Sequence, residues 1–487
     1  IVRGIFMTKK LFGLVSLLCA CLFFFSFSST AHAEKTYQIG TDVTYPPFEF
    51  ANKDNQYVGI DIDLLKAIAK EENFKVAIKP VGFNAAVQSL QSGQLDGVMA
   101  GMAMTDERKV KFDFSDPYYK TGFVMAVAKD SKITKLEQLR GKRVAIKTGT
   151  AAGEYAMSLK DKYGFTTVTF DDSDNMYNDV VNGNSVACFE DIPVMQYAIK
   201  TGTALKIVTK PAQGGYYGFA VMKGQNQELL KKFNAGLAKI KKNGEYQKIV
   251  DRYLSSKTVA AQKEAKKDGN SERTFLGLLK QNRQALLKGL GETLYLTIVG
   301  IICATIFGVI IGLLGILPNK FAQGLSTTII YIFRGLPLLV LALFIYNGLP
   351  SLTGVKIPAF VAGVITLMLN EGAYTAAFVK GGIEAVDKGQ MEAARSLGLP
   401  FGTAMRKVIL PQGLKIMVPS FVNQFIITLK DTSILSIIGI LELTQTGKII
   451  IARNLEGFKV WTIIALIYLI IITLLTWLSN YVQKKMN

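Results

Sequence analysis

Histidine and cysteine, two side chains that often act as general bases, nucleophiles or metal ligands, are few in this chain of 487 residues, which has one histidine and four cysteines. The single histidine, His32, lies in the apolar segment of residues 1–33, and two of the four cysteines lie there as well. The other two, Cys188 and Cys303, fall in stretches of very different composition. The sequence therefore predicts no structural disulfide, no Cys/His metal site and, once residues 1–33 are removed, no histidine-based acid–base catalysis.

The chain also lacks the glycine-rich loop with which many ATPases bind phosphate. That loop has the pattern G-x-x-x-x-G-K-[ST], and neither Gly141-Lys142 nor Gly447-Lys448 completes it. We therefore expect no ATPase site, no cofactor and no enzymatic activity in this chain, so any ATP hydrolysis must come from a partner.

Two charged residues, Arg334 and Glu371, stand inside long apolar stretches. A charge that faces lipid is costly, so such residues usually face a pathway, a partner helix or an interface. We expect both to lie along a translocation path or at an interface.

Hydrophobic residues make up 49% of the chain, but they are unevenly distributed. Residues 37–254 have the composition of a soluble domain, whereas long uncharged stretches follow from about residue 293. Much of the formal net charge of +19 lies beside those stretches, as expected for membrane helices whose basic flanks stay inside the cell. We therefore attribute the positive charge to membrane topology and expect no nucleic-acid binding.

The first 33 residues have the features of a secretory signal. Basic residues at 9 and 10 precede an apolar run at 11–27, and Ala31-His32-Ala33 has the small-x-small pattern of a cleavage site. Cleavage after Ala33 is the favoured interpretation. Two alternatives to cleavage stay open. The segment could remain as an uncut membrane anchor, or it could be lipidated within residues 18–21, where Cys19 and Cys21 lie.

Short apolar runs alternate with amphipathic stretches in residues 34–258, a pattern typical of α/β folds. The predicted strands are 37–41, 75–80, 97–99, 143–146, 185–189 and 218–222. The predicted helices are 63–70, 84–92, 174–181 and those that end near residue 253. This rhythm restarts once, so we expect two α/β lobes, with the chain crossing between them near Thr121 and again near Pro211.

Five membrane spans are predicted by length and hydropathy in residues 291–487. They are 293–317, 329–349, 359–379, 417–436 and 460–478. Residues 259–290 before them begin with charged residues and continue as an amphipathic stretch, so we expect a linker and a helix on the membrane surface. The fold class is therefore an α/β bilobed domain followed by an all-α membrane domain.

Four sequence blocks occur in a characteristic order and spacing; they are 40–50, 59–64, 105–109 and 112–119. Through these blocks, residues 36–254 resemble the polar amino-acid binding proteins of ABC importers, which have the type II periplasmic-binding-protein fold. The resemblance implies that a zwitterionic amino acid binds between the lobes on the outer face of the cell.

The resemblance also implies particular binding residues. Arg108 is expected to bind the α-carboxylate and Asp191 the α-ammonium, while Tyr45 and Phe83 form aromatic walls. The other positions that match the family's ligand contacts are Asp42, Gly101, Ala103, Lys147, Thr150 and Ala151.

The preferred amino acid is less sharply indicated. Lys147 and Asp42 resemble the glutamine-binding branch, in which a donor and an acceptor satisfy a side-chain amide. Glu190 and Ala103 replace a histidine and a threonine of that branch. Glutamine is the first choice; a basic amino acid, favoured by Glu190, and glutamate, favoured by Lys147, stay open.

Residues 290–483 resemble the permeases of amino-acid ABC importers. The pattern Glu392-Ala393-Ala394, then Gly398, nine further residues and a segment that ends at Pro411, resembles the loop that couples these permeases to their ATPase. Further blocks at 333–338, 372–374, 381–383 and 430–433 share the likeness, whereas Ala377 and Lys380 depart from the usual residues. A helix ending at Gly398 and a new element starting at Pro411 are expected.

Together these resemblances imply ATP-driven import of a polar amino acid across the bacterial plasma membrane. The expected partners are two copies of an ABC ATPase subunit, a second copy of this chain, membrane lipid and the amino acid itself, with the C-terminus in the cytoplasm. A glutamate-receptor-like channel is an alternative, although its pore segments interrupt the second lobe, whereas here both lobes end before the first span. A dehydratase shares the bilobed fold, but the chain supplies no catalytic set for one.

Overall fold

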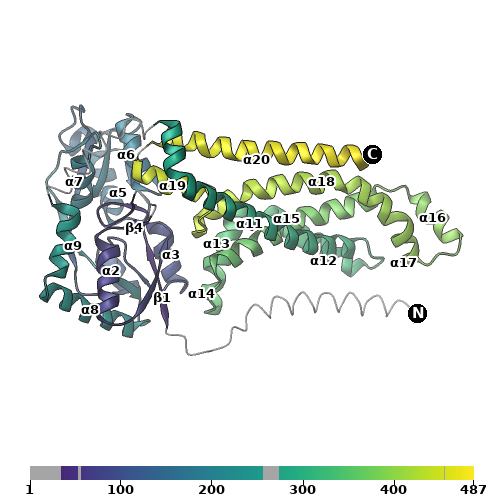
Figure 1. Cartoon of the computed structure of the whole chain (residues 1–487), viewed down its shortest axis with the longest axis horizontal. Coiled ribbons are helices and arrows are strands. Elements are labelled where there is room, and N and C mark those ends of the chain that lie inside the picture. The colour runs from purple at the N-terminus through teal and green to yellow at the C-terminus, as the bar shows by residue number, and fades with distance from the viewer. Residues whose placement is uncertain (1–34, 53–55, 256–273, 455, 487) are drawn as a thin grey trace. The chain divides into compact units, whose positions relative to one another are not determined.

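The computed structural model describes residues 35–52, 56–255, 274–454 and 456–486 (Figure 1). The predicted signal segment, residues 1–33, and residues 259–273 of the predicted linker lie outside the described residues. The α/β part and the helical part are described separately below.

The first lobe of the α/β part is built on a five-stranded sheet with the order β5-β1-β6-β14-β7. The strands are β1 (Thr36–Thr41), β5 (Lys75–Pro80), β6 (Gly97–Val98), β7 (Phe112–Phe114) and β14 (Ala220–Met222). Its helices are α2 (Ile60–Glu71), α3 (Phe83–Gln91), α4 (Asp106–Lys111), α8 (Gln227–Lys242) and α9 (Glu245–Leu254). A small sheet of β2 (Thr44–Tyr45), β3 (Glu49–Ala51) and β4 (Tyr57–Val58) accompanies it.

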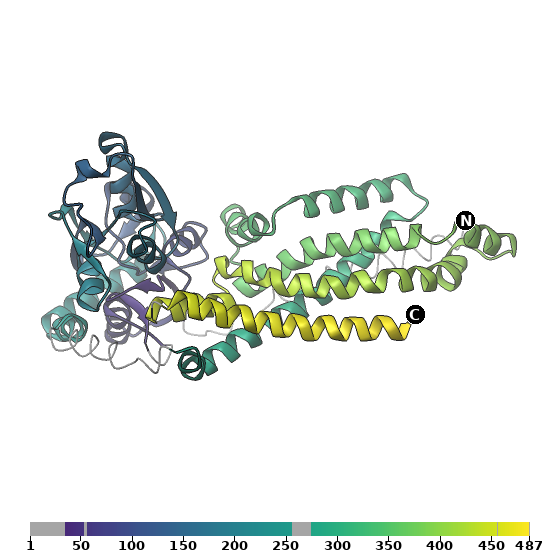
Figure 2. The same cartoon turned by 90° about the horizontal axis from the view of Figure 1, so that it is seen from above.

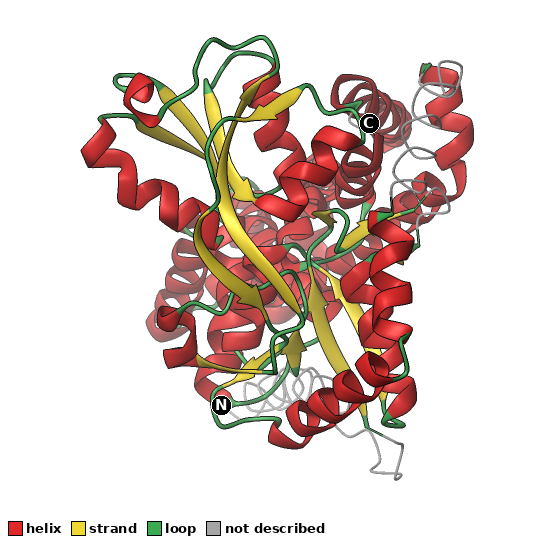
Figure 3. Cartoon of the chain, turned by 90° about the vertical axis from the view of Figure 1, so that its left-hand side faces the viewer, coloured by secondary structure: helices red, strands yellow, loops and turns green. Residues whose placement is uncertain are grey.

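The second lobe has a six-stranded sheet with the order β10-β9-β11-β8-β12, in which β13 also pairs with β8. The strands are β8 (Tyr119–Ala128), β9 (Arg143–Lys147), β10 (Thr166–Phe170), β11 (Ala187–Asp191), β12 (Leu205–Ile207) and β13 (Ala212–Tyr217). The helices are α5 (Ala151–Tyr163), α6 (Ser173–Val181) and α7 (Ile192–Lys200), after a short 3-10 turn at Leu136–Leu139. Figure 3 shows the two groups of strands, each flanked by helices.

Burial follows the strand period in the second lobe. Val124 and Ala126 of β8 pack in one apolar cluster with Met176 of α6, whereas Met125 and Val127 pack in another that includes Ala156 of α5. Because successive side chains of a strand point to opposite faces, the sheet is covered by helices on both sides.

Two antiparallel strands connect the lobes. Tyr217 of β13 is paired with Tyr119 of β8, and Gly215 with Thr121, before β14 joins the sheet of the first lobe. This confirms the predicted bilobed fold and its crossings near Thr121 and Pro211, as well as the predicted strands and helices to within a few residues.

The membrane half is helical. Its elements are α11 (Phe275–Gly315), α12 (Lys320–Gly335), α13 (Leu338–Leu343), a π segment (Phe344–Gly348), α14 (Leu349–Thr353), α15 (Ala359–Glu384), α16 (Lys388–Ser396), α17 (Phe401–Ala404), a π segment (Met405–Ile409), α18 (Leu410–Asp431), a 3-10 segment (Thr432–Ile438), α19 (Leu443–Asn454) and α20 (Gly457–Met486). Figures 1 and 2 show α11, α15, α18 and α20 as long helices that run beside one another.

By length and composition, four described helices could cross a membrane, and a fifth span is possible if the bent pair 320–335 and 338–353 counts as one. This agrees with the prediction of about five spans. The predicted second span at 329–349 is not one continuous helix, because two helices meet within it at 99°. Pro337 explains the break, since proline disfavours helical geometry at the residue before it and Leu336 is extended.

Two other boundaries differ from the prediction. Residues 275–290 do not form a separate surface helix, because α11 continues without interruption from Phe275 into the first span. The predicted fourth span begins earlier than expected, because one helical run extends from Phe401 to Ile438. A π segment at Met405–Ile409 precedes Pro411, so proline lies within this run instead of opening a separate element.

Glycines let α11 approach α15 closely. A Cβ atom added to Gly308 would lie 2.5 Å from the Cβ of Thr375, and one added to Gly312 would lie 2.6 Å from the Cβ of Val379. Such distances are too short for two carbon atoms that are not bonded, so these positions require glycine.

Replacing Gly308 by valine should therefore lower the stability of the membrane half by about 1–3 kcal/mol, the usual cost of overpacking. Gly291→Val is the matched control, because a Cβ at Gly291 of the same helix meets no atom within 4 Å. Thermal unfolding in detergent should show a lower midpoint for Gly308→Val than for the control. Equal midpoints would contradict the described packing.

Candidate functional site

A pocket between the two lobes gathers residues that are far apart in the sequence. Its lining consists of Asp42, Tyr45, Phe83, Ala100, Gly101, Ala103, Arg108, Lys147, Thr150, Ala151 and Asp191. All ten residues expected from the sequence lie in this lining, and Ala100 is an addition. Their contribution to binding stays a prediction.

Arg108 lies at the start of α4, where the Thr105 hydroxyl accepts a hydrogen bond from the Arg108 backbone N–H at 3.3 Å. The buried guanidinium donates to the carbonyl of Ala103 at 3.1 Å and, across the cleft, to that of Gly149 at 2.9 Å. It also lies over the Phe83 ring, 5.3 Å from the centroid. Because a guanidinium has five N–H donors, these bonds orient it and leave donors for a carboxylate.

Asp191 ends β11 and is held by hydroxyl groups. Its two carboxylate oxygens accept hydrogen bonds from Thr121 and, at 2.8 Å, from Tyr45. Burial raises the pKa of Asp191, although these hydroxyls and Arg108 act in the opposite direction. A cationic ammonium beside this carboxylate would favour its ionised form, as the predicted role requires.

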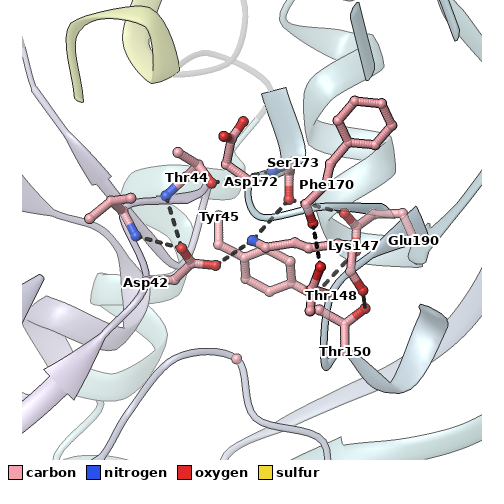
Figure 4. A network of polar contacts seen from close by, with 12 residues as sticks. Asp42, Thr44, Tyr45, Lys147, Thr148, Thr150, Phe170, Asp172, Ser173 and Glu190 are labelled. Atoms are coloured by element: carbon pink, nitrogen blue, oxygen red, sulfur yellow. Dashed lines mark hydrogen bonds and ion pairs between the residues drawn. The ribbon is translucent and has the colours of Figure 1, made fainter. Parts of the chain in front are cut away.

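A buried ion pair crosses the cleft next to these groups (Figure 4). Lys147 at the end of β9 donates to Asp42 of the first lobe, and both side chains are at most 2% exposed. Asp42 also accepts a hydrogen bond from the backbone N–H of Val43 at 2.7 Å. Burial lowers the pKa of Lys147, but the attraction of Asp42 and Glu190 outweighs it and leaves the pKa raised.

Backbone geometry shapes the pocket at two glycines. Gly101 has a φ of 53°, and a Cβ there would lie 2.4 Å from the Tyr45 ring. Gly149 has a φ of 70° and precedes Thr150, which caps α5 by accepting a hydrogen bond from the Gly153 N–H at 3.1 Å. These turns bring the backbone close to the position of a ligand.

Three supporting residues were not singled out from the sequence. Asp61 accepts hydrogen bonds from the Gly101 N–H at 2.8 Å and the Tyr118 hydroxyl at 2.7 Å. Ser173 accepts a bond from Lys147 at 3.2 Å, and the Tyr217 hydroxyl lies 3.2 Å from that of Tyr45. Asp61 stands within one of the family-like blocks, which was the available signal; Ser173 and Tyr217 carried none.

In the membrane half, the predicted coupling loop contains α16 and a turn. The Asp387 carboxylate caps α16, and Gly398 ends the turn with a φ of 80°. Glu392 and Ala393 are exposed, whereas Ala394 is buried. The next apolar residue, Leu397, is 83% exposed.

Arg334 and Glu371 do not form one site. Glu371 of α15 is buried and accepts a hydrogen bond from Gln424 of α18. Arg334 is exposed at the end of α12 and lies over the Tyr374 ring, 4.8 Å from its centroid. Their predicted location along a path or interface stays a prediction.

A bilobed α/β domain with a charged pocket, followed by apolar helices, defines the class of a solute-binding protein joined to a membrane permease. Two family models match accordingly. Residues 37–256 match the bacterial extracellular solute-binding proteins of family 3, and residues 304–487 match the inner membrane component of binding-protein-dependent transport systems.

Curated relatives match each half separately. The glutamine transport system permease protein GlnP of Escherichia coli K12 is 35% identical over 203 residues, 42% of this chain and 93% of that protein. The ABC transporter arginine-binding protein 1 of the same strain is 35% identical over 242 residues, 49% of this chain and 97% of that protein. The chain belongs to the family of amino-acid ABC importers, as a fusion of a binding protein with a permease.

A solved structure also matches the first half. The open second substrate-binding domain of Lactococcus lactis GlnP is 45% identical, covers 47% of this chain and 98% of that chain, and has a TM-score of 0.36. The family assignment rests on the sequence matches and not on this score. The chain is therefore a membrane-bound receptor-permease of an amino-acid ABC importer. Because residues 304–487 match permeases, the alternative of a glutamate-receptor-like channel is set aside.

Arg108→Ala should weaken amino-acid binding at least about 30-fold, because removing one partner of a buried charge-assisted pair costs about 2–5 kcal/mol. Calorimetry of the purified chain in lipid nanodiscs measures this change. Arg143→Ala, at an exposed arginine of the second lobe, is the matched control and should bind normally. Retained affinity in the Arg108 variant would exclude the predicted carboxylate contact.

The Asp61 carboxyl should make the stability of the binding domain depend on pH. Burial raises the pKa of Asp61 to about 6, above its ordinary value of 3.8. The folded state therefore holds the proton more tightly than the unfolded state, and this contribution to stability is lost as pH rises through 6. Between pH 5 and pH 8 this carboxyl should lower the free energy of unfolding by about 1 kcal/mol. Asp61→Asn, which retains an acceptor for Gly101 and Tyr118, should abolish that decrease.

Chemical denaturation at several pH values measures this effect, with the exposed Asp130→Asn as control. The control should keep the pH dependence of the unmodified chain. An equally steep profile in Asp61→Asn would rule out Asp61 as its source.

Proposed function

We propose that this chain captures a polar amino acid outside the cell, with glutamine as first choice, and passes it inward through its own membrane half. The observation that carries the proposal is the pocket itself, in which a buried guanidinium and a buried carboxylate stand beside aromatic rings. Arg108 binds the α-carboxylate and Asp191 the α-ammonium. Each charge of the zwitterion thus exchanges its hydrating water for a protein group of opposite charge.

The far end of the pocket favours an uncharged side chain. Lys147 and Asp42 already neutralise each other, so neither has a free charge for an ionised ligand. A side-chain amide offers one acceptor and two donors, and can bond to both groups without breaking their charge balance. The glutamine permease among the relatives agrees with this assignment.

Arginine is the second candidate. Glu190 adds a second buried carboxylate near Lys147, and a relative 35% identical is named an arginine-binding protein. A guanidinium would have to share Asp42 with Lys147, which makes arginine less favourable than glutamine in our proposal. Glutamate is third, because its carboxylate would lie beside Asp42, with the buried charge of Glu190 behind the pocket wall.

The energy for import comes from two copies of an ABC ATPase subunit that bind the loop between α15 and α18. The exposed Glu392, Ala393 and Leu397 support this, because an exposed leucine next to a short capped helix suits a groove on a partner. The face lies in the cytoplasm together with the C-terminus. Basic residues near it, such as Lys388, Arg395 and Arg406, agree with the rule that positive flanks stay inside.

A second copy of this chain completes the pathway in the membrane. The exposed Arg334 supports this arrangement, because α12 would otherwise place a guanidinium against lipid. Thr327, Thr328 and Gly335 are exposed on the same helix, and small or hydroxyl-bearing residues are common where membrane helices meet. The homodimer encloses the path, while its remaining apolar surface contacts lipid.

Uptake into liposomes tests the proposal. The chain reconstituted with an ABC ATPase subunit should accumulate radiolabelled glutamine only when ATP is supplied to the ATPase side. Leu397→Asp should reduce uptake at least about tenfold, because a buried unpaired carboxylate weakens the ATPase contact, and should leave glutamine binding unchanged.

Leu352→Asp is the matched control, since Leu352 of α14 is also exposed, at 78%. Uptake by this variant should stay near that of the unmodified chain. Import without any ATPase subunit, or normal uptake by Leu397→Asp, would refute the proposed coupling.

A further inference from the structure

Glu190 is a buried acid that does not line the pocket. It belongs to β11, directly before Asp191, and its side chain is fully enclosed. One carboxylate oxygen accepts a hydrogen bond from the Tyr177 hydroxyl at 2.9 Å, and the other accepts one from the Asp191 backbone N–H at 2.9 Å. The carboxylate is therefore fixed from two sides.

A hydroxyl group connects Glu190 to the pocket. Lys147 donates to the Ser173 oxygen at 3.2 Å, and Ser173 donates its own proton to Glu190 at 3.3 Å. Lys147 also donates to Asp42, so its ammonium lies between two carboxylates, one in direct contact and one behind a hydroxyl. Figure 4 shows this row of contacts from Asp42 through Lys147 towards Glu190.

The charges of this row do not cancel. Lys147 contributes one positive charge, whereas Asp42 and Glu190 contribute two negative charges when both are ionised. Because the groups are buried, their fields are weakly screened and reach the side-chain end of the pocket.

We propose that Glu190 determines the charge that the pocket accepts on a ligand side chain: from behind the pocket wall it adds a negative charge to the neutral pair of Lys147 and Asp42 and so disfavours an acidic side chain. This inference rests on the proposed amino-acid binding and deepens it. Glu190 acts through Lys147 as a specificity-determining positioning residue, not as a ligand contact.

The consequence can be stated as a ratio of affinities. Removing the Glu190 charge leaves Lys147 and Asp42 as a neutral pair. The glutamate side chain is then no longer repelled by an excess negative charge, and the arginine side chain is no longer attracted by it. At a separation of several ångströms in a protein interior, one charge changes binding by roughly tenfold or more. The ratio of glutamate affinity to arginine affinity should therefore rise by at least about tenfold.

Glu190→Gln tests this, because the amide keeps the size of the side chain and can still accept from Tyr177. Calorimetry of the full chain in nanodiscs with glutamine, glutamate and arginine at pH 8 gives all three affinities. That pH lies above the pKa of Glu190, which burial raises to about 7. Glutamine should bind within about threefold of the unmodified chain while the glutamate-to-arginine ratio rises.

Two controls separate charge from structure. Glu137→Gln removes an exposed carboxylate of the same lobe and should leave the ratio unchanged. Ser173→Ala removes the bridging hydroxyl but retains the Glu190 charge, so it should shift the ratio much less than Glu190→Gln does. An equal shift in both variants would overturn the inference, because the bridge and not the charge would then carry selectivity.

Other outcomes are equally decisive. If Glu190→Gln binds glutamine normally and the ratio does not move, the inference fails. If the variant weakens binding of all three amino acids alike, Glu190 is structural and the inference fails as well. The proposed function fails separately, namely if the unmodified chain binds none of the three.

Discussion

The closed arrangement of the two lobes depends on polar contacts that cross the cleft. Lys147 reaches Asp42, Arg108 reaches the Gly149 carbonyl, and Tyr45 reaches Asp191. Because these charged groups are buried, their partners offset the cost of removing them from water. The two crossing strands and a hydrogen bond from the Ser173 N–H to the Thr44 hydroxyl at 3.3 Å also join the lobes. In the proposed function, an amino acid that brings its own carboxylate and ammonium would supply further partners for Arg108 and Asp191 at the same place.

Much of the fold followed from the sequence because its signals are local. Short apolar runs, such as residues 75–80 and 143–146, alternate with amphipathic stretches and so indicated an α/β fold. The restart of this rhythm indicated two lobes. The pocket residues were found through ordered sequence blocks, since Arg108 and the Asp42 segment occur at family spacing. Contacts between distant residues were not predictable in this way: nothing near Asp61 in the sequence indicates that it holds Gly101, and nothing near Ser173 indicates that it lies between Lys147 and Glu190.

Hydropathy predicted the membrane half less precisely. It identifies apolar length but not direction, so the break at Leu336 and Pro337 was interpreted as part of one span although proline was visible in the sequence. The amphipathic residues 275–290 were assigned to the membrane surface, yet helical hydrogen bonding continues through them into α11. Polarity alone does not end a helix; only caps, glycine or proline do so reliably.

The unbroken helical run from Phe401 to Ile438 has a mechanical consequence. Its 38 residues correspond to a rod of roughly 55 Å at the usual helical rise. The π segment Met405–Ile409 precedes Pro411, and a second proline, Pro419, lies further along the same run. The run therefore connects the turn beside α16 to Gln424, whose amide donates a hydrogen bond to the buried Glu371 of α15. The loop at one end of the run and the interior of the bundle are thus joined by continuous helical backbone.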